Sequence, residues 1–183
     1  FSEVDITVII GNRMRGYHDL NKYVNECCGV AKGDFMMLFN DDSYIVTKDW
    51  DLELEKHLGT TVVLNPDTHD DAQCYNTFPI ISRDIYDLTG HFSLNAHNDT
   101  WVSYIAKKLN IEKHVDIEIY HDRPDNPNYI GSREQRMFED KTWAERTSTF
   151  PHSMAEFNSR EFIALREKYT QLIKNNLLNG DLK

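Results

Sequence analysis

The chain has 183 residues, 40% of them hydrophobic, and a formal net charge of −10 with a pI near 5.2. The hydrophobic fraction is typical of a globular protein and not of a disordered one, and the length predicts a single domain. Because a phosphate backbone needs clustered Lys and Arg, the acidic balance excludes nucleic acid or an anionic membrane surface as the main partner. No apolar run approaches the ~20 residues that span a bilayer, so no transmembrane segment is expected.

The start of the chain and its cysteines predict a cytoplasmic protein. Residues 1–10 lack the basic start and the cleavage site of a secretory signal. The chain has three cysteines, of which Cys27 and Cys28 are adjacent, and no CxxC spacing. This pattern is typical of reduced thiols and predicts neither a disulfide framework nor a zinc site.

The first third of the chain predicts a strand, a basic loop and a helix. Residues 4–10 form a β-branched run that predicts a strand, buried at its end. Arg13 and Arg15 follow in a loop, where their planar forks of donors could hold a diphosphate. The alternative is a pair of solvated loop arginines. Residues 17–30 carry apolar side chains at helical spacing and predict a helix.

The most informative stretch is 35–42. Residues 35–39 read Phe-Met-Met-Leu-Phe, which predicts a buried strand of a mostly parallel sheet. Asp41 and Asp42 follow at its carboxyl end, where open α/β sheets bind ligands. Adjacent carboxylates repel each other and are costly to desolvate, and a Mg²⁺ or Mn²⁺ shared with a ligand phosphate removes that cost. The alternative is an Asx-rich turn that closes the strand.

The rest of the chain continues the α/β pattern. Predicted helices cover 49–58, 84–89, 102–109 and 159–178, and predicted strands cover 60–64 and 115–120. The polar residues 65–76 predict a solvated loop whose acids and His69 could otherwise bind a metal. The last helix could pack on its own domain or against a second subunit. We therefore expect one domain over 1–183, with 151–183 as a C-terminal helical extension.

Asn25, Ala31, Gly33 and the pair Asp41-Asp42 resemble, in order and spacing, a motif series of the family 2 inverting nucleotide-sugar glycosyltransferases, which have the GT-A fold. The resemblance implies a Rossmann-like, mostly parallel sheet flanked by helices. It covers residues 6–121, the second half of that family's catalytic domain, so the family's N-terminal strands have no counterpart in the pattern. A sheet without its first strand would expose an edge that invites pairing with another chain.

The resemblance also implies roles for single residues. Asp42 would be a metal ligand, Asp41 would face the sugar-nucleotide, and Asn25 would belong to the same nucleotide-binding motif. Asp99, at the start of the helix 102–109, would be the general base, and His121 would complete the metal shell. From the residues alone, Asp99 could be only an N-cap and His121 an ordinary histidine at the end of a strand.

Together these features predict a metal-dependent transfer of a sugar from a nucleoside diphosphate sugar, with a UDP-sugar favoured, to a hydroxyl acceptor with inversion. A single displacement of this kind needs one base and no enzyme nucleophile. Two alternatives stay open. One is a non-catalytic module of the same fold that binds nucleotide or metal or serves assembly, and the other is a metal-dependent phosphohydrolase that uses the same acidic pair.

Overall fold

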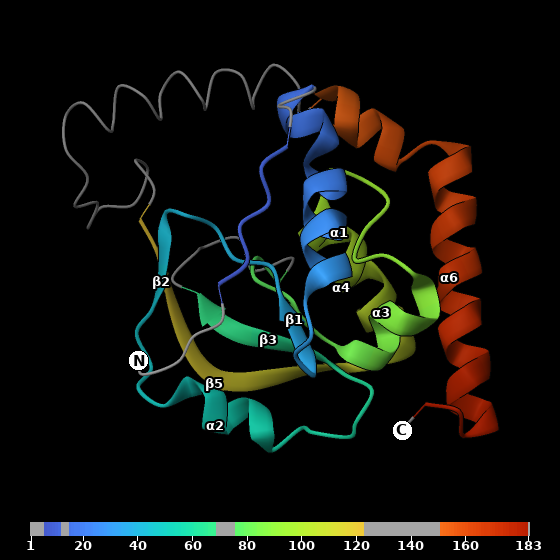
Figure 1. The fold of residues 1–183 in the computed structure, drawn as a ribbon. Helices are drawn as coiled ribbons and strands as arrows, with labels where there is room; N and C mark the ends of the chain where they lie inside the picture. The colour runs from blue at the N-terminus through green and yellow to red at the C-terminus, as the bar shows by residue number, and fades with distance from the viewer. Residues whose placement is uncertain (1–5, 12–14, 69–75, 123–150, 183) are drawn as a thin grey trace.

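The computed structural model describes residues 6–11, 15–68, 76–122 and 151–182, which form an α/β fold around a curled five-stranded sheet (Figure 1). The strands are β1 (Phe35–Met37), β2 (Ser43–Ile45), β3 (Val63–Thr68), β4 (Ile80–Ser82) and β5 (Glu112–His121). The helices are the 3₁₀ turn η1 (Gly16–Asp19), α1 (Leu20–Val30), α2 (Trp50–Glu55), α3 (Arg83–Thr89), α4 (Asn98–Leu109) and α6 (Arg160–Asn179). Residues 151–157 are also helical.

The sheet is mixed, so the expectation of a mostly parallel sheet is wrong. The strand order is β1-β4-β3-β5-β2. Of the described strand pairs, β3–β5 is parallel, whereas β1–β4, β3–β4 and β2–β5 are antiparallel. The apolar run that begins at Phe35 forms an edge strand, not a central one. An unbroken apolar run shows that a strand is covered on both faces, but it does not encode which strand lies beside it or in which direction.

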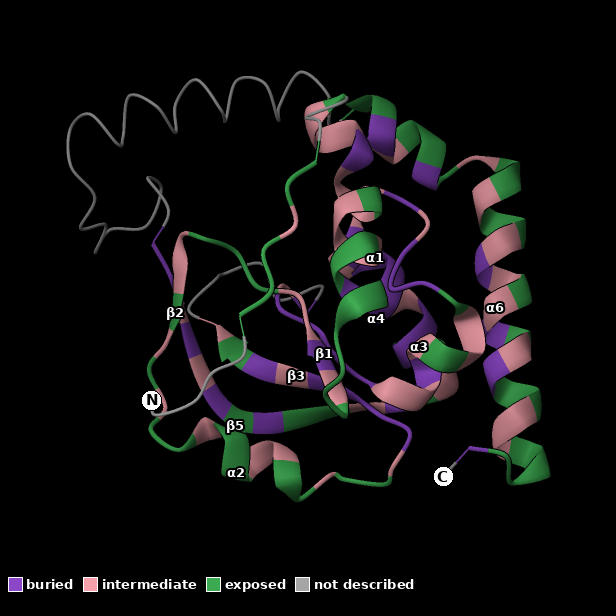
Figure 2. Cartoon of the chain, in the orientation of Figure 1, coloured by how far each residue is buried: buried purple, intermediate pink, exposed green. Residues whose placement is uncertain are grey.

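The core has two parts, one on each face of the sheet. The larger part packs helices α3, α4 and α6 on the sheet and contains Trp101, Ile105 and Ile173. The smaller part lies on the side of α2 and is built around Leu64 and Ile117. Figure 2 shows the buried residues concentrated on β3, β5 and the elements that cover them.

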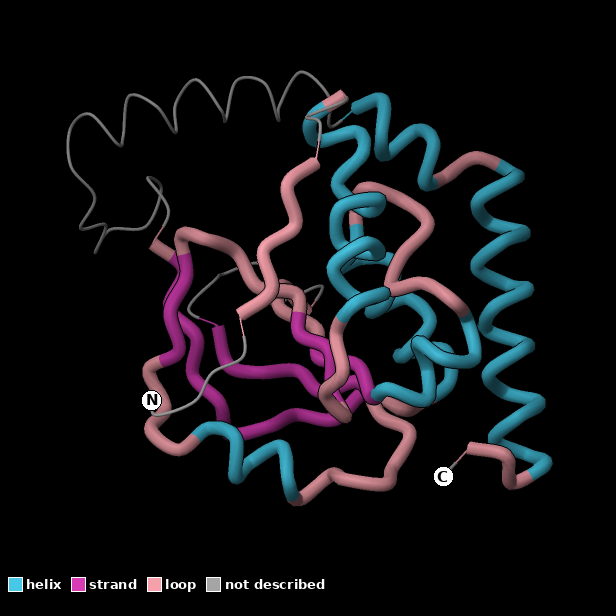
Figure 3. The backbone as a smooth tube through the Cα atoms, viewed as in Figure 1, coloured by secondary structure: helices cyan, strands magenta, loops and turns pink. Residues whose placement is uncertain are grey.

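Residues 6–11 do not form the predicted strand. They are an extended segment outside the sheet, and Ile6, Val8 and Ile10 are 81%, 75% and 93% exposed. Figure 3 draws this segment as loop. A β-branched run forms a strand only where a neighbouring strand shares its backbone hydrogen bonds, and no described strand pairs with this one.

Most of the predicted helices and strands are confirmed within a few residues. The final helix is α6, whose N-cap Ser159 accepts a hydrogen bond from the Phe162 amide and whose last turn ends at Gly180 with φ 78°. It packs on its own domain, where Ile173 is 1% exposed. Strand β3 extends to Thr68, into the predicted loop, and His69 lies outside the described residues. In the described part, no helix is both long and apolar enough to cross a bilayer.

Candidate functional site

Asp42 and His121, which lie far apart in the sequence, contact each other in the structure. His121 Nε2 lies 3.1 Å from Asp42 Oδ1. The His121 side chain is 5% exposed and that of Asp42 is 31% exposed, so the imidazole is buried and the carboxylate is partly in contact with solvent. The sequence predicted both residues as metal ligands. The structure brings them together in a direct acid–histidine contact, and metal binding by the pair stays a prediction.

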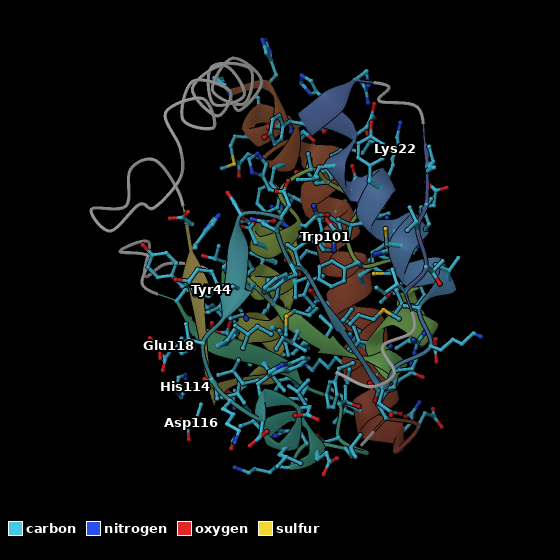
Figure 4. All side chains as sticks on the ribbon, turned by 60° about the vertical axis from the view of Figure 1, so that its left-hand side comes forward. Lys22, Tyr44, Trp101, His114, Asp116 and Glu118 are labelled. Atoms are coloured by element: carbon cyan, nitrogen blue, oxygen red, sulfur yellow. The ribbon has the colours of Figure 1, made fainter. Side chains whose placement is uncertain are left out.

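The pairing of β2 with β5 creates this contact. Ser43, directly after Asp42, lies opposite His121 in the antiparallel register. The Asp122 amide extends the ladder by donating to the Asp42 carbonyl at 2.8 Å. The next residue pair along these strands is Tyr44 and Tyr120, whose rings pack at a tilt with centroids 5.0 Å apart. Figure 4 labels Tyr44 on β2. Sequence reasoning did not anticipate that the Asp122 backbone continues this ladder.

The His121 ring is held from the interior side as well. The Phe78 ring meets it edge-on with centroids 5.2 Å apart, and Phe78 itself is fully buried. Phe39, which follows β1, packs on Phe78 at 5.9 Å. The imidazole therefore has a fixed apolar wall behind it and the carboxylate in front of it.

Two opposing effects act on the pKa of Asp42. Burial raises this pKa, but the hydrogen bond and the charge of His121 outweigh burial and leave the pKa below its ordinary value. The carboxylate therefore stays ionised at neutral pH. A His121 Nε2 that donates its proton to this carboxylate has no lone pair for a metal, so a cation could bind both residues only after this proton is lost.

The separation of 3.1 Å is that of a direct hydrogen bond between the two side chains, so a cation at this pair would have to replace their contact. Within the residues that the structure describes, no group of three or more His, Cys, Asp or Glu side chains could hold a metal ion. The pair would therefore supply two ligands, and ligand phosphate and water would complete the shell, as is usual for Mg²⁺.

The residues predicted to hold the nucleotide have different surroundings. Asp41 is exposed in the turn before β2. Arg13 lies outside the described residues. Arg15 is engaged within the chain, since its guanidinium donates to Asp19 at 2.8 and 3.1 Å. Hydrogen bonds from Arg15 and from Lys22 hold the pKa of Asp19 below its ordinary value. A diphosphate would have to compete with this carboxylate for Arg15.

Asn25 anchors the loop between α3 and α4. Its Oδ1 accepts hydrogen bonds from the amides of Phe92 at 2.7 Å and Ser93 at 3.2 Å, and its Nδ2 donates to the Ser93 carbonyl at 2.7 Å. The Asn25 side chain thus makes the hydrogen bonds to the Phe92 and Ser93 backbone that the main chain of a neighbouring strand would otherwise make. This accounts for Asn25 structurally, and its contact with a nucleotide stays a prediction.

Arg83 holds the Ala31–Gly33 turn, a contact that sequence reasoning did not anticipate. Its guanidinium donates to the carbonyls of Ala31 and Gly33, both at 2.8 Å. A Cβ added at Gly33 would come within 3.3 Å of the Phe35 carbonyl, so the turn has little room for a side chain. Asn25 and the Ala31–Gly33 turn are two parts of the motif series, and both are hydrogen-bonded to residues of α3 or of the loop after it.

Asp99 lies in the first turn of α4 and is not its N-cap, which is His97. Its Oδ1 accepts a hydrogen bond from the Thr100 amide at 2.7 Å. No hydrogen bond or ion pair in the described part joins Asp99 to Asp42 or His121, so its base role stays a prediction.

Comparisons with known proteins give no relative. No protein-family model matches the chain, no curated protein matches it and no solved structure matches it. What is known of the site therefore comes from the sequence and the geometry above.

Proposed function

We propose that the chain transfers a sugar from a nucleoside diphosphate sugar to a hydroxyl acceptor with inversion, with a divalent cation at Asp42 and His121. The observation that carries the proposal is the contact between the ionised Asp42 carboxylate and the buried His121 imidazole at 3.1 Å. The motif series around Asn25, Gly33 and Asp42 supports the reaction class, because it resembles that of the family 2 glycosyltransferases.

Each candidate residue would have a separate role in this transfer. Asp42 and His121 would hold Mn²⁺ or Mg²⁺, and the bound ion would supply electrostatic stabilisation of the diphosphate leaving group. Asp41, exposed beside them, would face the donor. Asp99 would take the proton of the acceptor hydroxyl as general base, a role worth about 10²–10⁴-fold.

A non-catalytic module of the same fold is the second candidate. It is favoured by the engagement of Arg15 with Asp19 and of Asn25 with the Phe92–Ser93 backbone, because both side chains are accounted for without a nucleotide. Under this alternative the acid–histidine pair would bind a cation or simply join β2 to β5.

Calorimetric titration of UDP in the presence of Mn²⁺ tests the site. We expect Asp42→Asn to lose the Mn²⁺-dependent part of UDP binding, because the amide is a far poorer cation ligand than a carboxylate. The matched control is Asp41→Asn, the same change on the neighbouring exposed residue, which should retain most of the binding. Equal binding by the wild type and Asp42→Asn would remove the metal assignment.

The same preparations separate an enzyme from a binder. Asp99→Asn should keep UDP binding but reduce acceptor-dependent UDP release by at least about 10²-fold, the low end for a general base. A wild type that binds UDP with Mn²⁺ and turns over no donor sugar with any acceptor would favour the non-catalytic module. Release of phosphate without an acceptor would favour the phosphohydrolase.

A further inference from the structure

Strand β1 is built as an interior strand but lies at the edge of the sheet. Met36 is 4% exposed and belongs to the core on the side of α4, whereas Phe35 and Met37 pack against the core on the side of α2. Natural edge strands are usually protected by charge, proline or a bulge. The run Phe-Met-Met-Leu-Phe carries none of these.

The hydrogen bonds of β1 show which of its groups are unpaired. The Arg83 amide donates to the Asp34 carbonyl at 2.7 Å, and the Leu38 amide donates to the Pro79 carbonyl at 3.2 Å. In an antiparallel pair the backbone groups of alternate residues point to the same side. The N–H and C=O groups of Phe35 and Met37 therefore point away from β4, toward an edge where no described strand pairs.

Residues 6–10 have the composition of a strand but are hydrogen-bonded to no described strand. Ile6, Val8 and Ile10 recur at every second position, so an extended backbone places them on one side, and each is at least 75% exposed. The structure gives the backbone of residues 6–11 no hydrogen bond to any described residue. Figure 1 draws the segment, in dark blue, as a thin tube without the arrow of a strand.

We propose that residues 6–10 of one copy add as a strand to the free edge of β1 in a second copy, which gives a symmetric dimer. Among the described residues, the segment 6–10 and the outer edge of β1 each pair with no strand, so a reciprocal exchange would satisfy both. Within one chain, the segment makes no hydrogen bond to its own β1. The inference rests on backbone pairing alone and stands apart from the proposed reaction.

Light scattering during size-exclusion chromatography, repeated over a range of protein concentrations, tests the dimer. The wild type should approach twice the 21.5 kDa mass of one chain as the concentration rises. Val8→Asp should weaken association by at least about tenfold, because the exchange would bury the introduced charge. Val8 is 75% exposed in the single chain, so this variant should fold.

The matched control is Leu178→Asp, which introduces the same charge at a residue of α6 that is 76% exposed. It should dimerise like the wild type. Amide hydrogen exchange gives the second readout, since the amides of Phe35 and Met37 should be slowed in the dimer and fast in the monomer. A wild type that stays monomeric, a Val8→Asp variant that dimerises as well as the wild type, or slow exchange of these amides in a monomer would overturn the proposal.

Discussion

The regions around His91 and His121 use a buried histidine in opposite ways. His91 is 7% exposed and His121 is 4% exposed. His91 meets the edges of Tyr169 at 4.3 Å and Trp101 at 6.1 Å, and neither of its ring nitrogens has a hydrogen-bond partner among the described residues. His121 Nε2 instead lies 3.1 Å from Asp42 Oδ1, and the Asp42 side chain is partly exposed to solvent.

The surroundings of His91 favour the neutral ring. It borders an apolar cavity of about 20 Å³ between the sheet, α4 and α6, whose wall includes Trp101 and Ile173. Burial lowers the pKa of His91 to about 4. A cavity of this size is just large enough for one water.

The difference teaches that burial by itself does not mark a functional histidine. His91 is a space-filling ring whose polar atoms have no described partner, whereas His121 has an ionised partner that solvent can reach. A titratable group is a better functional candidate when burial is combined with a specific charged neighbour. Three measurements would break or sharpen this comparison.

The largest effect should come from removing residues 159–183, which covers the His91 region. This segment places Ile173 of α6 and Leu182, which follows the helix, in the core, and α6 packs Phe162, Leu165, Tyr169 and Leu177 against it. A fully buried large apolar side chain is worth about 1.5–3 kcal/mol, and a domain is stable by only about 5–15 kcal/mol. The truncated chain should therefore fail to fold, as circular dichroism and thermal melting would show. A truncated chain that melts like the wild type would contradict the role of α6 in this core.

The next effect concerns acid stability and His91. The pKa of His91 falls from 6.5 in the unfolded chain to about 4 in the folded one, so the unfolded chain takes up the proton first. The stability from the neutral ring is fully present above pH 6.5 and is lost as the pH falls toward 4, in all about 3 kcal/mol. His91→Phe keeps the ring and removes this proton, so it should flatten the pH dependence of the unfolding free energy over that range. An unchanged slope would show that His91 is not the group responsible.

A third and somewhat smaller effect than the acid destabilisation should come from the same substitution at the other histidine, where the loss of stability should already be present at neutral pH. His121→Phe deprives Asp42 of its partner, and a hydrogen bond to a charged group is worth about 1.5–3 kcal/mol. We expect a loss of this size in urea unfolding at pH 7.5, where His91→Phe should cost little or even stabilise. If both variants lose stability equally, the two regions use histidine alike and the comparison fails.

The elements of the fold could largely be predicted from the sequence because helices depend on local hydrogen bonds. The Ser159 cap, the apolar stripe of α6 and the Gly180 stop lie within the helix they define. The helix α1 and the strand β5 were likewise predicted within a few residues. These patterns state which residues are helical or extended and which side is apolar.

For the site, the sequence supplied the candidates but not their relations. It named Asp42 and His121, but only the pairing of β2 with β5 put them in contact. It gave Asn25 a binding role, whereas the fold shows this amide holding the Phe92–Ser93 backbone.

The sequence by itself indicated the helices, the approximate positions of β1, β3 and β5, and the acid and histidine of the candidate site. It did not predict β2 or β4 as strands. Tertiary structure alone decided the strand order, the antiparallel pairings, the edge position of β1 and the exposure of residues 6–10. The physical reason is the sequence separation of the residues that share backbone hydrogen bonds. A helix satisfies its backbone within four residues, whereas a strand must find its donors and acceptors in a distant segment. A run such as that of β1 shows that it needs a neighbour, and only the folded chain shows which neighbour it has.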